Sequence, residues 1–253
     1  MSTPTIDLIH RHGSIRKYTA DPIPKETIET IVGAAQRAST SSNLQVVSVV
    51  AVTDAGKRKR LSEVCGQEHV AQAPVVLVWC ADLKRLDRAC ELRGIRQVTD
   101  YVENFLVCAV DVGIAAQTAA LAAESLGLGI CYLGSIRNNV QAVIDLLRLP
   151  RLVFPVNGMA VGWPAVSPIA RPRLATSAVL SWEQYTETDD ATLRNYDRIM
   201  AATGVYQGRQ VPVPGKPGEM EDYGWMEHSG RRAEQALRTE LRAVLKRQGF
   251  GLE

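Results

Sequence analysis

The sequence has little net charge and no long run of apolar residues free of polar ones. Its 253 residues include 29 Lys and Arg against 27 Asp and Glu, which gives a net charge of +2. This balance is too mild to indicate a nucleic-acid-binding protein. Residues 1–20 lack a continuous apolar core, so we expect no signal peptide. The most apolar stretch, 105–123, contains Asp111 and Gln117, which predicts a buried helix rather than a membrane span. We therefore expect a cytoplasmic protein without nucleic-acid or membrane partners.

Several familiar catalytic and binding motifs are missing as well. The five cysteines are widely spaced and form no C-x-x-C pair, which indicates reduced, mostly structural thiols. The glycine-rich stretch 126–134 does not match G-x-G-x-x-G, and neither G-x-x-x-x-G-K-[ST] nor G-x-S-x-G occurs. His10 and His12 would diverge by about 200° on a helix. His69 and His228 have no ligand-spaced neighbours, so we interpret them as satisfied or solvent-facing and expect no metal site. These absences favour chemistry carried by a bound cofactor.

The apolar pattern predicts a globular chain of mixed helices and strands. Apolar residues make up 46% of the sequence and charged residues 22%. β-Branched runs predict strands over 46–52, 75–80, 130–133 and 154–161, the first two buried on both faces. The helix predicted over 98–126 is apolar nearly all round, which indicates the protein's centre or a subunit interface. Residues 202–222 are rich in Gly and Pro and predict a long surface loop. The other helices are predicted over 5–12, from Pro24 to about 35, and over 54–65, 139–147, 186–201 and 225–248.

Three distant segments carry groups suited to a phosphate monoester. The first, His12-Gly13-Ser14-Ile15-Arg16-Lys17-Tyr18, combines an imidazole, a hydroxyl and two cations beside a flexible glycine. The second, Arg171-Pro172-Arg173, holds two guanidinium groups on a stiff backbone. The third, 38–42, is a run of hydroxyls. One phosphate cradle built from all three is one interpretation; three unrelated solvated loops are the other.

Five stretches resemble, in chain order, the nitroreductase-like family of flavoenzymes. They are HGSIRKYTADPIP, ASTSSNLQVVSVV, CGQEHVAQAPV, AAESLGLGICYLGSIRN and the run from GMAVGWP to RPRL, which together span about residues 6–185. The resemblance is closest to the NADPH-dependent nitroreductase and flavin reductase branch. It implies an α+β fold with a mainly antiparallel sheet flanked by helices, FMN as cofactor, and a homodimer with two flavin sites across its interface. We divide the chain into an FMN-binding core over 1–185 and a C-terminal helical extension over 186–253 of the same domain, with the flexible loop 202–222.

The resemblance also implies FMN ligands in five segments. Residues 12–16 would contact the phosphate, the ribityl chain or the polar edge of the ring. The run 40–42 would donate to phosphate or ribityl oxygens, and 171–173 would bind the phosphate. Gln67 would hydrogen-bond the isoalloxazine ring, although alone it fits a surface amide equally well. Backbone amides of 132–135 would face N5 and O4 of the flavin. The implied ligands are His12, Ser14, Arg16, Thr40, Ser41, Ser42, Gln67, Tyr132, Leu133, Gly134, Ser135, Arg171 and Arg173.

Two of these positions depart from the family pattern. Gly13 stands where the family usually has Arg, which removes a possible phosphate contact. Ser135 stands where the family's Y-I-G-G turn has its second Gly, since this chain has Tyr132-Leu133-Gly134-Ser135.

The resemblance implies an NAD(P)H oxidoreductase that reduces nitroaromatics, quinones or free flavins by ping-pong hydride transfer. The chemistry would take place at flavin N5, so no side chain need act as a catalytic acid or base. Arg209, in the loop 202–222, is the candidate for gripping the NADPH 2′-phosphate; a solvated loop charge is the other interpretation, and NADH remains open as the coenzyme. A flavin-binding or flavin-sensing protein without turnover is the alternative function. A module whose basic terminal helix docks an acidic partner is a third, although a solvated face explains that helix better.

Overall fold

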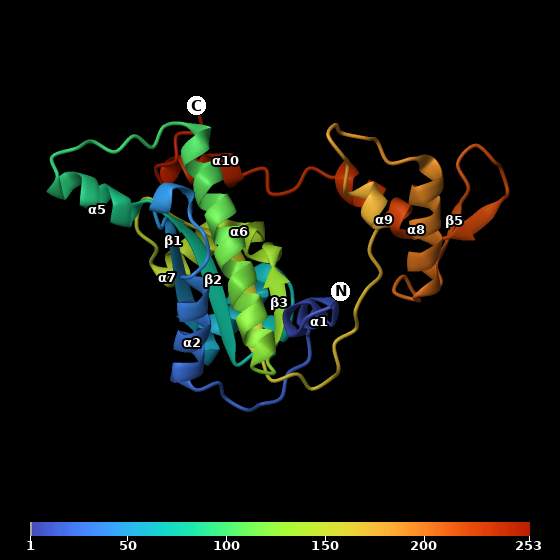
Figure 1. Ribbon diagram of the computed structural model, residues 1–253, viewed down its shortest axis with the longest axis horizontal. Coiled ribbons are helices and arrows are strands. Elements are labelled where there is room, and N and C mark those ends of the chain that lie inside the picture. Colours follow the sequence, from blue (N-terminus) through green and yellow to red (C-terminus); the bar gives the residue numbers. More distant parts are fainter. Residues whose placement is uncertain (1) are drawn as a thin grey trace. The chain divides into compact units, whose positions relative to one another are not determined.

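The computed structural model describes residues 2–253, which form two compact units (Figure 1). The first unit comprises the chain up to Ala170 together with Arg238–Glu253. The second unit comprises Arg171–Leu237. The sequence-based division at residue 185 stays a prediction.

A four-stranded antiparallel sheet forms the centre of the first unit. Its strands run in the order β1-β2-β4-β3, with β1 over Val47–Val52, β2 over Val75–Asp82, β3 over Gly129–Leu133 and β4 over Val153–Gly162. Every residue of β2 is buried, as its β-branched run predicts. The strand predicted over 46–52 is present as β1, but its predicted burial on both faces was wrong: β1 is an edge strand whose residues are mostly half-buried, because only β2 pairs with it.

Helices cover both faces of this sheet. Alternate residues of β2 point to opposite faces, so Val75, Leu77 and Trp79 join one apolar cluster while Val76 and Val78 join another. The first cluster lies under α2 and α6, which run side by side along the sheet in Figure 1. The second lies under α3 and α7. The helices of the first unit are α1 (Pro4–His10), α2 (Lys25–Ala35), α3 (Ala55–Cys65), α4 (His69–Gln72), α5 (Lys84–Leu92), α6 (Val102–Ser125), α7 (Val140–Leu147) and α10 (Leu241–Arg247), with 3-10 turns η1 (Ser41–Asn43) and η2 (Gly134–Asn139).

Helix α6 has a buried small-residue face and an exposed apolar face. The buried face carries alanines, among them Ala116, Ala119 and Ala120, which let the helix approach the sheet closely. By length and composition α6 would also suit a membrane span, but here it packs on the sheet and on α2. Its other face repeats large apolar side chains every fourth residue, and each is between 41% and 56% exposed. These residues, the α6 stripe, are Val102, Leu106, Val110 and Ile114.

The C-terminal segment does not form the single helix predicted over 225–248. Helix α9 (Trp225–Glu234) ends before an irregular stretch in which Arg238 has φ +55°, and α10 follows. The reason is tertiary: Val244 and Leu245 of α10 are buried in the first unit, beside Phe154 and Phe250, whereas α9 belongs to the second. Packing in two units overrides the helical propensity of the connecting residues.

The second unit is a small helical body with a hairpin. It holds α8 (Asp190–Ala202), α9, the 3-10 turn η3 (Thr176–Ala178), and a two-stranded antiparallel hairpin of β5 (Gln210–Pro212) and β6 (Met220–Asp222). The hairpin lies within the stretch 202–222 that was predicted to be a loop. The buried centre of the second unit consists of Tyr196, Met200, Tyr206, Val211 and Tyr223. Packing of these mainly aromatic side chains orders the glycine-rich stretch 202–222.

Candidate functional site

The segment 12–18 lies beside β3 without forming a strand of the sheet. The Ile15 amide donates to the Ile130 carbonyl at 2.8 Å, and the Tyr18 hydroxyl donates to the Ile15 carbonyl at 2.6 Å. Gly13 and Ile15 are buried, while Ser14 and Arg16 are exposed. Because side chains alternate along extended backbone, Ser14 and Arg16 share the exposed face. His12 instead lines a cavity together with Gly13 and Ile15, so the structure groups Ser14 with Arg16 and does not show His12 beside them.

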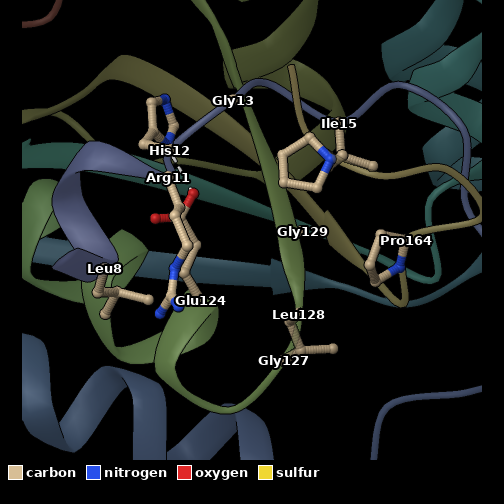
Figure 2. Close-up of a pocket in the computed structure, with 11 residues that line it drawn as sticks. Leu8, Arg11, His12, Gly13, Ile15, Glu124, Gly127, Leu128, Gly129 and Pro164 are labelled. Atoms are coloured by element: carbon tan, nitrogen blue, oxygen red, sulfur yellow. Dashed lines mark hydrogen bonds and ion pairs between the residues drawn. The ribbon is translucent and has the colours of Figure 1, made fainter. Parts of the chain in front are cut away.

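His12 is anchored by a carboxylate that the sequence did not single out. Its Nδ1 lies 2.5 Å from Oε1 of Glu124, near the end of α6, and the Glu124 side chain is only 11% exposed. Figure 2 shows the two side chains facing each other at a cavity of about 230 Å³, where Arg11, His12 and Glu124 are the titratable lining groups. With Nδ1 engaged by Glu124, only Nε2 of His12 is left for a ligand.

Gly13 is required by close backbone packing. A Cβ at this position would lie 2.7–2.9 Å from backbone atoms of Ile169, closer than such contacts occur. An Arg therefore cannot enter here unless the segment around Ile169 shifts. The close approach of the backbone at Ile169 therefore explains why this chain has Gly13 where the family usually has Arg.

The turn after α3 fixes the backbone of Gln67. Helix α3 ends at Gly66 in the left-handed conformation, φ +61°, which glycine adopts without strain. The Gln67 amide donates to the Ser62 carbonyl at 3.2 Å, and the Ser62 hydroxyl donates to the Gln67 carbonyl at 3.0 Å. The Ser135 hydroxyl donates to Oε1 of the Gln67 side chain at 3.3 Å. Gln67 and Ser135, 68 residues apart, are thereby joined.

Arg16 lies close enough to several buried groups to influence their ionisation. Burial raises the pKa of Tyr18 and of Cys131, and the Arg16 cation lowers both in part. Burial and, secondly, Arg16 lower the pKa of His69. The Nε2 atom of His69 is buried without a hydrogen-bond partner among residues 2–253. The interpretation of His69 as satisfied or solvent-facing was therefore wrong: its neighbours come from segments far away in the sequence.

The turn 132–135 continues β3 into η2. Tyr132 pairs with Met159 of β4, and its hydroxyl donates to Oε1 of Gln117 in α6 at 3.3 Å. Leu133 is buried and pairs with Gly158, and η2 begins at Gly134. Since Ile130 of the same strand pairs with Ile15, this turn and the segment 12–16 share one sheet edge.

The hydroxyl run 40–42 lies elsewhere in the first unit. The Ser41 amide donates to both carboxylate oxygens of Asp111, at 3.1 and 3.2 Å, and Asp111 is only 2% exposed. Asp111 and Glu124, which anchors His12, both belong to α6. Thirteen residues of helix separate them by about 20 Å. One chain therefore does not gather Thr40, Ser41 and Ser42 with His12 around a single phosphate.

Arg171 and Arg173 belong to the second unit. The Tyr196 hydroxyl donates to the Pro172 carbonyl between them at 3.1 Å. Arg173 lines a cavity of about 530 Å³ together with Thr192, Asn195 and Tyr196. Their convergence with the segment 12–16 stays a prediction.

Arg209 is fixed within the second unit. Its Nε donates to the Tyr206 carbonyl at 3.0 Å, and its guanidinium lies 4.0 Å from the centre of the Tyr223 ring. Within residues 2–253 its terminal nitrogens have no hydrogen-bond partner. A stacked arginine with a free fork is suited to bidentate recognition of phosphate.

These groups suit an anionic aromatic ligand. Exposed Ser14 and Arg16 offer donors for anionic oxygens, and Gln67 and the orphaned Nε2 of His69 offer hydrogen-bonding atoms for a polar ring edge. FMN carries both kinds of group, so the residues present fit it. In the part of the chain that the structure describes, no three His, Cys, Asp or Glu side chains gather as a metal site.

Comparisons with known proteins agree along the whole chain. Residues 9–163 match the nitroreductase family, and residues 171–253 match the C-terminal domain of that family. The chain is 39% identical over 247 residues to the FMN reductase [NAD(P)H] of Bacillus subtilis, covering 96% of each. It is 40% identical over 200 residues to the oxygen-insensitive NADPH nitroreductase of Salmonella typhimurium, covering 79% of this chain and 82% of that protein. The structure of the NADPH:FMN oxidoreductase from Vibrio harveyi, complexed with NAD+, has a TM-score of 0.87 at 36% identity, covering 99% of this chain and all of that one. The predicted α+β fold is confirmed.

Proposed function

The chain belongs to the nitroreductase family, in its NADPH-dependent nitroreductase and flavin reductase branch, and on that premise we propose the following function. The protein is an FMN-dependent NAD(P)H oxidoreductase that reduces nitroaromatics, quinones or free flavins by ping-pong hydride transfer. Relatives named as FMN reductase, nitroreductase and NADPH-flavin oxidoreductase support it. The structural observation that carries it is the contact of Ser135, just after β3, with Gln67, two residues before His69, whose Nε2 is buried without a partner among residues 2–253.

The residues of this chain would hold and orient FMN. When bound, FMN supplies the redox chemistry, taking a hydride from NAD(P)H and passing electrons to the acceptor. His12 and Ser14 would bind the phosphate end, together with Arg171 and Arg173. Arg16 and Gln67 would donate to the ring edge, and a cation there stabilises negative charge that develops on reduction. The backbone of Tyr132, Leu133, Gly134 and Ser135 would line the ring on the sheet side.

The complete site would need a second copy of the chain. Thr40, Ser41 and Ser42 are tied to the middle of α6, about 20 Å from the anchor of His12. A partner subunit would supply its own hydroxyl run to this flavin. The α6 stripe offers an apolar surface for that contact, since unpaired apolar repeats of this size mark association surfaces. We therefore propose a homodimer with two shared sites.

Two further assignments follow from single features. Arg209, stacked on Tyr223 with its fork free, would bind the 2′-phosphate and favour NADPH over NADH. The five cysteines are all free thiols, and four are buried, which supports a reducing, cytoplasmic location.

The first test is the visible spectrum of the purified protein. We expect flavin absorbance, or uptake of added FMN by colourless protein, and bleaching by NADPH under nitrogen. Addition of a nitroaromatic or a quinone should restore the colour. Protein that takes up no FMN would refute the proposal; protein that holds FMN but is not bleached by NADPH or NADH would instead be a flavin-binding protein without turnover.

A further inference from the structure

We propose that the Ser135 side chain is a positioning residue for Gln67, holding the Gln67 amide so that its NH₂ group faces the flavin ring. The inference rests on the proposed function and deepens it, because it assigns a role to a side chain where the family pattern has none. Ser135 would act through Gln67 rather than through its own contact with the ring.

The backbone of Gln67 leaves its side chain free to be steered. Gly66 and the two hydrogen bonds to Ser62 fix where the side chain begins. Beyond that point Gln67 is exposed, and a glutamine side chain has three rotatable bonds. An exposed, flexible amide loses conformational entropy when it binds a ligand. A hydrogen bond that already holds it reduces that cost.

Ser135 is well placed to hold it. It is the second residue of the turn η2, and Leu133 two residues earlier is buried and paired with Gly158 of β4. Ile136, the next residue of η2, is also buried, so the turn that carries the Ser135 hydroxyl is anchored on both sides, whereas Gln67 lies in a connection. The 3.3 Å contact runs from the Ser135 hydroxyl to Oε1, so the carbonyl end of the amide is occupied.

The result is an amide with a fixed direction. The Ser135 hydroxyl holds Oε1 of Gln67, so the Nε2 hydrogens point away from Ser135 and remain to donate to a ligand. The isoalloxazine edge carries carbonyl oxygens and ring nitrogens that accept hydrogen bonds. An unheld amide could turn its oxygen toward these acceptors, which would repel them. The serine thus selects the productive orientation of Gln67.

A double-mutant cycle on flavin-free protein tests this coupling. Binding of FMN and of riboflavin would be measured by flavin fluorescence for wild type, Ser135→Ala, Gln67→Ala and the double variant. We expect Ser135→Ala to weaken binding of both flavins roughly three- to tenfold, since one hydrogen bond is lost. In the Gln67→Ala background the same change should have almost no further effect. Ser135→Thr keeps the hydroxyl and should bind like wild type.

The outcomes separate the inference from the function on which it rests. An equal loss from Ser135→Ala with and without Gln67 would mean that Ser135 acts independently, and no loss would mean that it does not act at all; either overturns the inference while FMN binding by wild type stands. If Ser135→Ala weakened binding of FMN but not of riboflavin, Ser135 would act on the phosphate of FMN, and the inference would also be overturned. Wild-type protein that binds neither flavin would refute the proposed function itself.

Discussion

At the residue scale, we predict that the choice between NADPH and NADH depends on the guanidinium of Arg209, which is stacked on Tyr223. Arg209→Ala should raise the KM for NADPH about five- to thirty-fold, or about 1–2 kcal/mol, and leave the KM for NADH nearly unchanged. The reason is that only NADPH carries the 2′-phosphate that would occupy the free fork. Steady-state kinetics with both coenzymes measure the difference.

The matched control for Arg209 is a second arginine beside the same ring. The Arg231 guanidinium lies 6.0 Å from the Tyr223 ring, but its Nε donates to Glu227 at 2.6 Å. Arg231→Ala should therefore change neither KM. Equal losses with NADPH and NADH in Arg209→Ala would contradict the assignment, as would equal effects of the two arginine variants.

The surroundings of some site residues could be predicted from the sequence, whereas those of others could not. The shared face of Ser14 and Arg16 follows from alternation along an extended segment, and the sequence suffices for it. The partner of His12 does not follow, because Glu124 is 112 residues away and only folding brings it near. The orphaned Nε2 of His69 was missed for the same reason. A histidine without ligand-spaced neighbours can still gain a charged neighbour, here Arg16, through tertiary structure.

At the scale of elements, a substitution at Gly13 tests how tightly the segment 12–18 packs against the backbone of Ile169. Gly13→Ala should lower the free energy of unfolding by about 1–3 kcal/mol, because its Cβ would overlap the backbone around Ile169. Urea denaturation followed by circular dichroism measures this change. Gly33→Ala is the control: nothing lies within 4 Å of a Cβ there, and Gly33 is an interior residue of α2. It should stabilise the protein by about 0.5–1 kcal/mol. Equal effects of the two changes would contradict the close packing at Gly13.

The elements that the sequence predicted well are those with strong local patterns. The β-branched runs became β1, β2 and β4, and the amphipathic stretch 54–65 became α3 almost to the residue. The predicted terminal helix failed because its two halves pack in different units, which no local pattern encodes. The hairpin of β5 and β6 was missed because its strands have only three residues each, and aromatic packing beside them supplies the stability.

At the scale of the whole molecule, the candidate ligands could be predicted from the sequence, but the distances between them could not. The strand order β1-β2-β4-β3 puts β3 at one edge, where the segment 12–18 joins it. The hydroxyl run instead reaches the middle of α6 through Asp111. Since both anchors are on one rigid helix, their separation of about 20 Å is fixed. In the homodimer that we propose, a second chain brings both groups to one flavin, so we expect cofactor binding and assembly to be coupled.

This coupling gives the last prediction. Wild-type protein should sediment at about twice 27.6 kDa at micromolar concentration. Val110→Lys places a charge in the centre of the α6 stripe, on the face turned away from the buried alanines, and should yield a folded monomer that has lost most of its FMN. Val110→Ala keeps the stripe apolar and should remain a dimer with FMN bound. Analytical ultracentrifugation with detection at flavin wavelengths measures the mass of the protein and whether FMN sediments with it. A wild-type monomer that holds FMN, or a Val110→Lys monomer that keeps it, would show that one chain completes the site and would reject the shared architecture.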